Sequence, residues 1–400
     1  MTIQQLVGLL IVAGTLTWYA PTARAHGEKS QEPFLRMRTI MWYDVQFSTE
    51  KVQVNEELTI TGKFHLFEGW PTRVVPPPTQ AWLNVSVPGP QLIRKAAYLN
   101  GVAVVSTVSL ALGRDYEFKI VMQGRNPGSF HLHPMINVEG GGPIVGPGTW
   151  VTVEGDRATF TNPVTTLTGE TIDLETYALG RVVGWHLITI LLAVAWLGYW
   201  LARPFLGRLL LVEGGAPEEE LVSERDRRVG LAFLVVAVLL VVGGYYTTNA
   251  AYPVTVPLQS GRVDVTPLPE APRDVEATVQ RATYAVTTRT FAMDLQVTNT
   301  SNRPFQLGEM ATANVRFLNP TLFPQAEHRL MVEPAGPINP GESKTMRATA
   351  ADAVWETEHL TMEYDPENRF AALLMFFDTE GSRRIIAVGA GPVIPQYRGT

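Results

Sequence analysis

The sequence predicts a mainly β protein whose two large β regions are separated by a pair of membrane-spanning helices. Three observations support this fold class: a low content of charged residues, two long uncharged apolar runs, and short alternating stretches separated by Pro- and Gly-rich turns. Charged residues make up 18% of the 400 residues and hydrophobic residues 46%, whereas about 25% of a soluble domain is charged. Part of the chain is therefore expected to lie in lipid.

The alternating stretches indicate β-strands on both sides of the apolar runs. From Leu58 to Leu66, and again from Phe291 to Val297, apolar side chains alternate with polar or small ones, which is the period of a strand with one buried face. Short strands with turns between them are typical of a sandwich or barrel. The sequence thus predicts one β-sandwich in residues 26–180 and another in 248–400, the second preceded by a proline-rich linker from Pro253 to Pro272.

The two apolar runs have the length of membrane spans. Val182 to Trp200 holds 19 residues and Val229 to Tyr246 holds 18, none of them formally charged, and each can cross about 30 Å of hydrocarbon. The positive-inside rule places the loop between them in the cytoplasm, because it carries Arg203, Arg208, Arg225, Arg227 and Arg228. We expect a hairpin over 181–247 with both β regions in the periplasm; two buried core helices are a weak alternative for runs this long.

Residues 1–25 have the features of a secretory signal peptide. An apolar stretch runs from Leu6 to Leu16, and Ala23-Arg24-Ala25 resembles a signal-peptidase cleavage sequence. No Lys or Arg precedes the apolar stretch, so an uncleaved N-terminal anchor is the alternative. Cleavage after Ala25 makes His26 the first residue of the mature chain.

Composition excludes several functional classes. The net charge is −6, and the chain offers no basic block with which to neutralise the phosphates of a nucleic acid. Because the sequence contains no cysteine, disulfides and thiolate metal sites are excluded. Phosphate-loop, serine-hydrolase and zinc-protease motifs are missing as well. Any metal must be held by nitrogen, oxygen or thioether sulfur.

An N-terminal histidine is a candidate metal ligand. The free α-amine and the imidazole of His26 can chelate one ion together, since both groups are neutral at modest cost near pH 7 to 8. Copper(II) favours such nitrogen-rich sites. The alternative is that the signal peptidase cuts before a histidine with no role.

Two further histidines are placed to share a ligand. His131 and His133 lie at positions i and i+2 of a β-like stretch, so both imidazoles project from one face of the strand. The alternative is a pair of ordinary surface histidines. His65 lies on the polar side of its own predicted strand and is either a ligand or a surface histidine.

Taken together, several stretches resemble one known family. His26-Gly-Glu-Lys-Ser-Gln, Trp42-Tyr-Asp, Gly62-Lys-Phe-His-Leu-Phe, His131-Leu-His and Asn137-Val-Glu-Gly-Gly-Gly-Pro-Ile are similar to segments of the B (beta) subunit of the copper membrane monooxygenases, the family of the particulate methane and ammonia monooxygenases. The similarity continues through Pro257-Leu-Gln-Ser-Gly and Gly391-Pro-Val-Ile-Pro, and so covers the chain almost from end to end.

The resemblance implies two periplasmic cupredoxin-like β-sandwich domains joined by the transmembrane hairpin, in a multi-pass protein of the inner or intracytoplasmic membrane. It implies a copper site formed by His26, His131 and His133, and two sister membrane subunits of the A and C type, assembled as a trimer of heterotrimers. Some members hold a second copper with two histidines, where this chain has Met41 and His65. One imidazole and one thioether are a poor copper cage, so we expect that second site to be missing.

The expected function is that of a copper-binding subunit of a membrane monooxygenase that oxidises methane, ammonia or a short alkane with O₂. Two alternatives stay open. One is a periplasmic copper carrier, which has no need of a membrane hairpin or a second β region. The other is a structural subunit whose sister subunit holds the active site.

Overall fold

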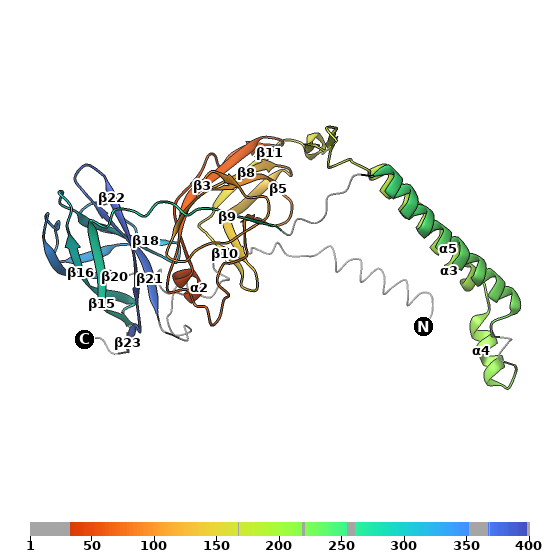
Figure 1. Ribbon diagram of the computed structural model, residues 1–400. Coiled ribbons are helices and arrows are strands. Elements are labelled where there is room, and N and C mark those ends of the chain that lie inside the picture. The colour runs from red at the N-terminus through yellow and green to blue at the C-terminus, as the bar shows by residue number, and fades with distance from the viewer. Residues whose placement is uncertain are drawn as a thin grey trace. The chain divides into compact units, whose positions relative to one another are not determined.

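The computed structural model describes residues 33–166, 168–217, 221–253, 261–351, 367 and 369–397. The chain divides into two compact units, one of Met1–Phe160 with Ser260–Thr400 and one of Thr161–Gln259. Figure 1 shows that the first unit is built of strands, whereas the second contains the long helices. The mainly β prediction is thereby confirmed, while the predicted signal peptide and His26 lie outside the described residues.

Two sheets, built mainly from the first half of the chain, enclose one apolar core to which Trp42, Phe64, Phe118 and Leu132 contribute. The first sheet has the strand order β1 (Ile40–Phe47), β3 (Glu57–Leu66), β8 (Asp115–Gly124), β5 (Leu92–Leu99) and β6 (Val102–Ala103). The second has the order β14 (Arg262–Val263), β7 (Thr107–Val108), β4 (Ala81–Ser86), β9 (Gly128–Val138), β11 (Thr149–Glu154) and β2 (Lys51–Gln53), with β10 (Gly142–Val145) also paired to β9.

The segment expected to be a linker is partly built into this first pair of sheets. Arg262 and Val263 pair in parallel with β7, Val265 is buried in the core, and the Leu268 N–H donates to the Asp115 carbonyl. An extended proline-rich backbone has free hydrogen-bonding groups, and a sheet edge satisfies them. The chain therefore returns to the first pair of sheets before it forms the second.

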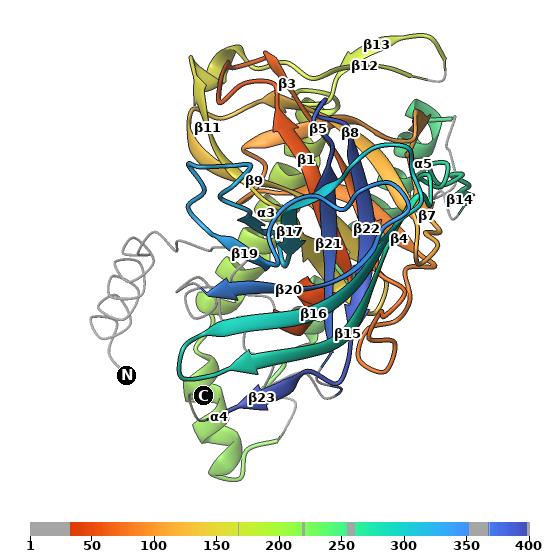
Figure 2. The same ribbon diagram turned by 90° about the vertical axis from the view of Figure 1, so that its left-hand side faces the viewer.

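A second pair of sheets, shown in Figure 2, encloses a separate core that contains Phe291, Phe305, Phe317 and Phe370. One sheet has the order β19 (Leu330–Glu333), β20 (Ser343–Ala351), β16 (Thr290–Asn299), β15 (Val275–Ala285) and β23 (Ile394–Gln396). The other has the order β18 (Val315–Leu318), β17 (Gln306–Thr312), β21 (Phe370–Phe377) and β22 (Arg383–Ala390). The alternation from Phe291 to Val297 falls in β16, as predicted.

Residues near the start of the described chain link the two pairs of sheets. Met37, in the short helix α2 (Pro33–Arg38), is buried in the second core although strand β1 directly follows it. Met41 and Tyr43 of β1 pack with Leu373 and Met375 of β21 in a small apolar cluster. Beside this cluster, Asp44 forms an ion pair with Arg383.

In its described residues, the second unit contains a short hairpin and three helices. Strands β12 (Pro163–Thr165) and β13 (Thr171–Asp173) pair with each other and precede α3 (Leu179–Leu201), α4 (Phe205–Glu213) and α5 (Glu224–Ala251). Helices α3 and α5 contain the two predicted spans and are long and apolar enough to cross a membrane by length and composition. They run alongside each other (Figure 1), with Trp196 packed on Phe233 at a ring distance of 5.0 Å. Helix α4 was not predicted.

A buried carboxylate joins the ends of these three helices. Asp226, at the start of α5, forms a capping box with Ser223, which satisfies backbone donors that the first helical turn leaves open. Its carboxylate also accepts hydrogen bonds from Tyr199 Oη at 2.5 Å and Arg208 Nη1 at 2.6 Å, and Arg203 Nε lies 3.3 Å away. One side chain thus connects the end of α3, the helix α4 and the start of α5.

Replacing Asp226 by Asn should destabilise this end of the hairpin, because two arginines lose the charge that balances them in a buried position. We expect a lower midpoint of thermal unfolding for the detergent-solubilised protein. Glu224→Gln is the matched control: its pair with Arg228 is exposed on both sides, and such pairs contribute little. Equal midpoints for the two variants would contradict a stabilising role of Asp226.

Candidate metal site

The predicted histidine pair lies on β9, a strand held between β4 and β11. The rings of His131 and His133 have centroids 4.4 Å apart and are almost perpendicular, at 81°. As the i, i+2 spacing predicts, both imidazoles lie on one face, while Leu132 between them is buried in the core. Two imidazoles that could act as nitrogen ligands are therefore brought together by a single strand.

A backbone carbonyl holds His133 in position. His133 is 3% exposed, and its Nδ1 lies 2.8 Å from the carbonyl oxygen of Gly146. Because a carbonyl only accepts, Nδ1 is the donor, and the neutral ring then carries its lone pair on Nε2. Histidines that bind a metal through one ring nitrogen usually donate a hydrogen bond from the other nitrogen in this way.

Glycine is required near this ring. A Cβ at Gly148 would lie 2.5 Å from Nδ1 of His133 and 2.6 Å from the carbonyl oxygen of Leu132. A Cβ at Gly146 would press on the indole of Trp42 at 2.8 Å. The segment from Gly140 to Gly148, which holds five glycines, thus contains the groups that support His133. Neither glycine carries a sequence signal of this role.

An indole covers His131. Trp150 lies directly opposite His131 in the β9–β11 register, and the two ring centroids are 5.0 Å apart. Trp150 is 55% exposed, so its indole contacts His131 on one side and faces solvent on the other. Trp150 therefore forms one wall of the position that the two imidazoles define.

The donor set is suited to copper as far as the structure describes it. Two imidazoles on one face match the nitrogen preference of copper(II). Within the described residues, no group of three or more His, Cys, Asp or Glu side chains could hold a metal ion. The pair therefore requires a further donor, and His26, the predicted third ligand, lies outside the described residues.

His65 lies elsewhere, on β3, directly opposite Met41 in the register with β1. It was predicted on a polar face, yet only 6% of it is exposed, because this face of β3 packs near the second pair of sheets. Its Nδ1 lies 3.2 Å from Oδ1 of Asp115, and Tyr43 Oη donates to the same oxygen at 2.9 Å. Burial, with a smaller contribution from Asp115, raises the pKa of Tyr43, so the tyrosine remains a hydrogen-bond donor.

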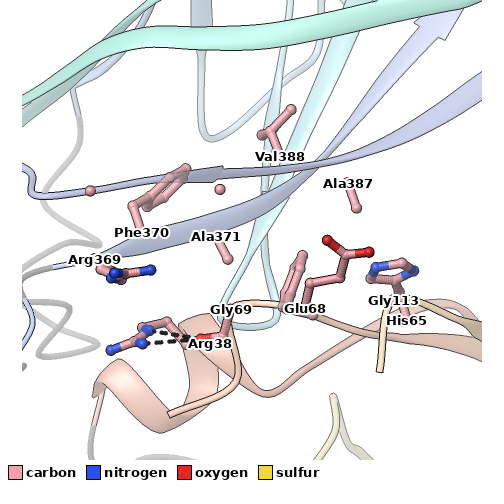
Figure 3. Close-up of a pocket in the computed structure, with 13 residues that line it drawn as sticks. Arg38, His65, Glu68, Gly69, Gly113, Arg369, Phe370, Ala371, Ala387 and Val388 are labelled. Carbon is pink, nitrogen blue, oxygen red and sulfur yellow. Dashed lines mark hydrogen bonds between the residues drawn. The ribbon is translucent and has the colours of Figure 1, made fainter. Parts of the chain in front are cut away.

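Figure 3 shows His65 at one side of a cavity of about 540 Å³. Glu68 lies beside it, and Arg38 and Arg369 lie toward the other side. Arg38 already donates to the Gly69 carbonyl and to Glu367 at 2.6 Å. Of the described residues around this cavity, His65 is the single imidazole, which makes a two-histidine copper site there unfavourable.

Comparison with known proteins gives a family match and a relative that each cover most of the chain. Residues 27–397 match a protein family described as that of the monooxygenase B subunit. A Methylococcus capsulatus (strain Bath) protein named particulate methane monooxygenase alpha subunit is 47% identical over 403 residues, covering 98% of this chain and 97% of that protein. The letter B agrees with the expected subunit type, whereas the Greek letter in the relative's name differs from the expected beta.

Two solved structures show more remote similarity. The cupredoxin domain of amoB from Nitrosocaldus yellowstonii is 17% identical and covers 30% of this chain and 91% of that chain, with a TM-score of 0.25. A protein of unknown function from Porphyromonas gingivalis W83 is 11% identical, covers 86% and 98%, and has a TM-score of 0.19. At these scores the likeness establishes no shared fold.

Gly148→Ala should weaken metal binding without removing a ligand, because the new methyl group displaces the His133 ring or the β9 backbone. We expect the copper affinity to fall by about 10- to 100-fold, as for other changes around metal-bound histidines. A chelator competition titration measures this. The control is Gly69→Ala, where a Cβ has no neighbour within 4 Å; equal affinities in both variants would refute the role of Gly148.

His65→Ala should leave the number of coppers per chain unchanged, since Met41 is packed in an apolar cluster and His65 faces Asp115. The same change should lower thermal stability, because it removes a buried ring that packs on Phe67 at 5.3 Å. Metal analysis and thermal unfolding of one preparation provide both readings. Loss of one copper per chain would show that Met41 and His65 do form a site.

Proposed function

Because the chain belongs to the family of monooxygenase B subunits, we propose that it is the copper-binding subunit of a membrane monooxygenase that oxidises methane, ammonia or a short alkane with O₂. The observation that carries the copper assignment is the pair of imidazoles on β9, with centroids 4.4 Å apart. The family match across residues 27–397 supports its place in a monooxygenase complex.

We propose that copper is held by His26, His131 and His133. His133 offers Nε2, because its Nδ1 donates to Gly146. His131 lies beside it, and cleavage after Ala25 would add the imidazole and α-amine of His26. When bound there, copper would supply one-electron redox chemistry. The protein's part is to hold three neutral imidazoles together and to limit water on the side that Trp150 covers.

The membrane arrangement is proposed on the same basis. Residues 1–25 would be a cleaved signal peptide, 181–247 a transmembrane hairpin, and 26–180 and 248–400 two cupredoxin-like domains in the periplasm. Two sister subunits of the A and C type would pack in a trimer of heterotrimers. The exposed apolar side chains of α3 and α5 support contact with lipid and with the apolar helices of such subunits.

No feature of the described residues favours the copper-carrier alternative. A carrier has no use for two helices long enough to cross a membrane or for a second pair of sheets. A structural role, with catalysis in a sister subunit, is compatible with copper binding here. Residues 182–200 of α3 and 229–246 of α5 contain no Asp, Glu, Lys or Arg, so these spans offer no charged group for catalysis within the membrane.

The proposal is tested by His131→Ala with His133→Ala in the complete complex. We expect the complex to assemble and to lose one copper per copy of this chain, together with the corresponding copper(II) resonance signal. His328→Ala is the control, because that half-buried ring packs on Phe317, far along the chain from β9. An unchanged copper content and signal in the double variant would disprove the assignment.

A further inference from the structure

Helix α4 presents an apolar side that nothing in the described chain covers. Leu206, Leu210 and Leu211 are 75%, 67% and 57% exposed. Residues 206 and 210 are four apart and share one face of the helix, and residue 211 lies about 100° further round. Three leucines exposed within a nine-residue helix require a covering partner, because such a patch would otherwise face water.

The opposite side of α4 is anchored. Arg208 lies on the side of the helix opposite Leu206 and Leu210 and binds the carboxylate of Asp226 at 2.6 Å. Its guanidinium also lies 3.4 Å from the carbonyl of Leu221, and Leu209 and Val212 are half-buried. The helix is therefore held against the start of α5 in one rotational setting, and that setting turns the leucines outward.

The anchoring places α4 at the end of the apolar spans. Residues 202–204 alone separate it from α3, and Trp196 and Trp200 contact each other in the last turns of α3. Tryptophans at the end of a span mark the membrane–water boundary. Arg225 and Arg227 are exposed at the same end of α5, where they would meet lipid phosphates, while Arg228 pairs with the exposed Glu224.

We propose that α4 is an interfacial helix that lies in the membrane leaflet at this arginine-bearing end of the hairpin. Its leucines enter the boundary between headgroups and acyl chains, as amphipathic helices do, and the neighbouring arginines contact anionic headgroups. One observation favours lipid over a protein partner: the exposed leucines of α4 follow directly on the exposed leucines at the end of α3, Leu197 and Leu201. The proposal rests on the membrane placement of α3 and α5 proposed above.

Because this chain contains no cysteine, each introduced cysteine is the single label on it, and the complex without an introduced cysteine gives the background labelling of the other subunits. Spin labels are placed singly at Leu210→Cys, at Leu191→Cys in the middle of α3, and at Arg225→Cys, with the complete complex in vesicles of phosphatidylglycerol and phosphatidylethanolamine. The accessibility of each label to O₂ and to a water-soluble nickel chelate is measured. Leu206→Cys, one turn before Leu210 on the same face, is the second position on α4.

We expect labels at 206 and 210 to favour O₂ over the nickel chelate, with a depth between those at 191 and 225. Labels at 206 and 210 that favour nickel as strongly as 225 would overturn the proposal. So would labels that are immobile and shielded from both reagents, since that result means contact with a sister subunit. If the label at 191 also favours nickel, the proposed membrane span itself fails, and the two failures are thereby distinguished.

Discussion

The candidate metal site depends on how β9 is held. Hydrogen bonding to β4 and β11 fixes the strand, its pleat places His131 and His133 on one face, and the Gly146 carbonyl sets which nitrogen of His133 carries the lone pair. Buried Leu132 and the core below prevent the strand from slipping by one residue, a shift that would turn both histidines to the other face. The ligand pair is thus a consequence of sheet packing and needs no metal to form it.

The Met41–His65 position shows the opposite case. The strand register brings the two residues together, but the second pair of sheets packs against that face and supplies apolar neighbours to Met41. Tyr43 and Asp115 then occupy the polar side of His65. Met41 and His65 thus lie where the two pairs of sheets pack against each other, close to the Asp44–Arg383 ion pair.

Local patterns predicted much of this structure. The alternation from Leu58 to Leu66 and the two uncharged runs correspond to β3, α3 and α5, because strand and helix periods are properties of neighbouring residues. The i, i+2 spacing of His131 and His133 was sufficient to place both rings on one face. The burial of His65, the return of residues 262–265 to the first core, and the support of His133 by Gly146 were not predictable, because each depends on segments distant in the sequence. Helix α4 was not predicted because its nine residues are too few to cross a membrane, while their apolar composition is not typical of a short helix in an exposed loop.

The central claim is that one copper is bound by three histidines of this chain together with its N-terminal amine. Electron–nuclear double resonance of the intact complex, in which histidine alone carries ¹⁵N, tests it most directly. We predict a copper(II) centre coupled to three histidine imidazoles and to the α-amine of His26. The measured mass of the mature chain should show that it begins at that residue. A chain that begins at Met1, or a complex with no copper centre coupled to three histidines, would contradict the account.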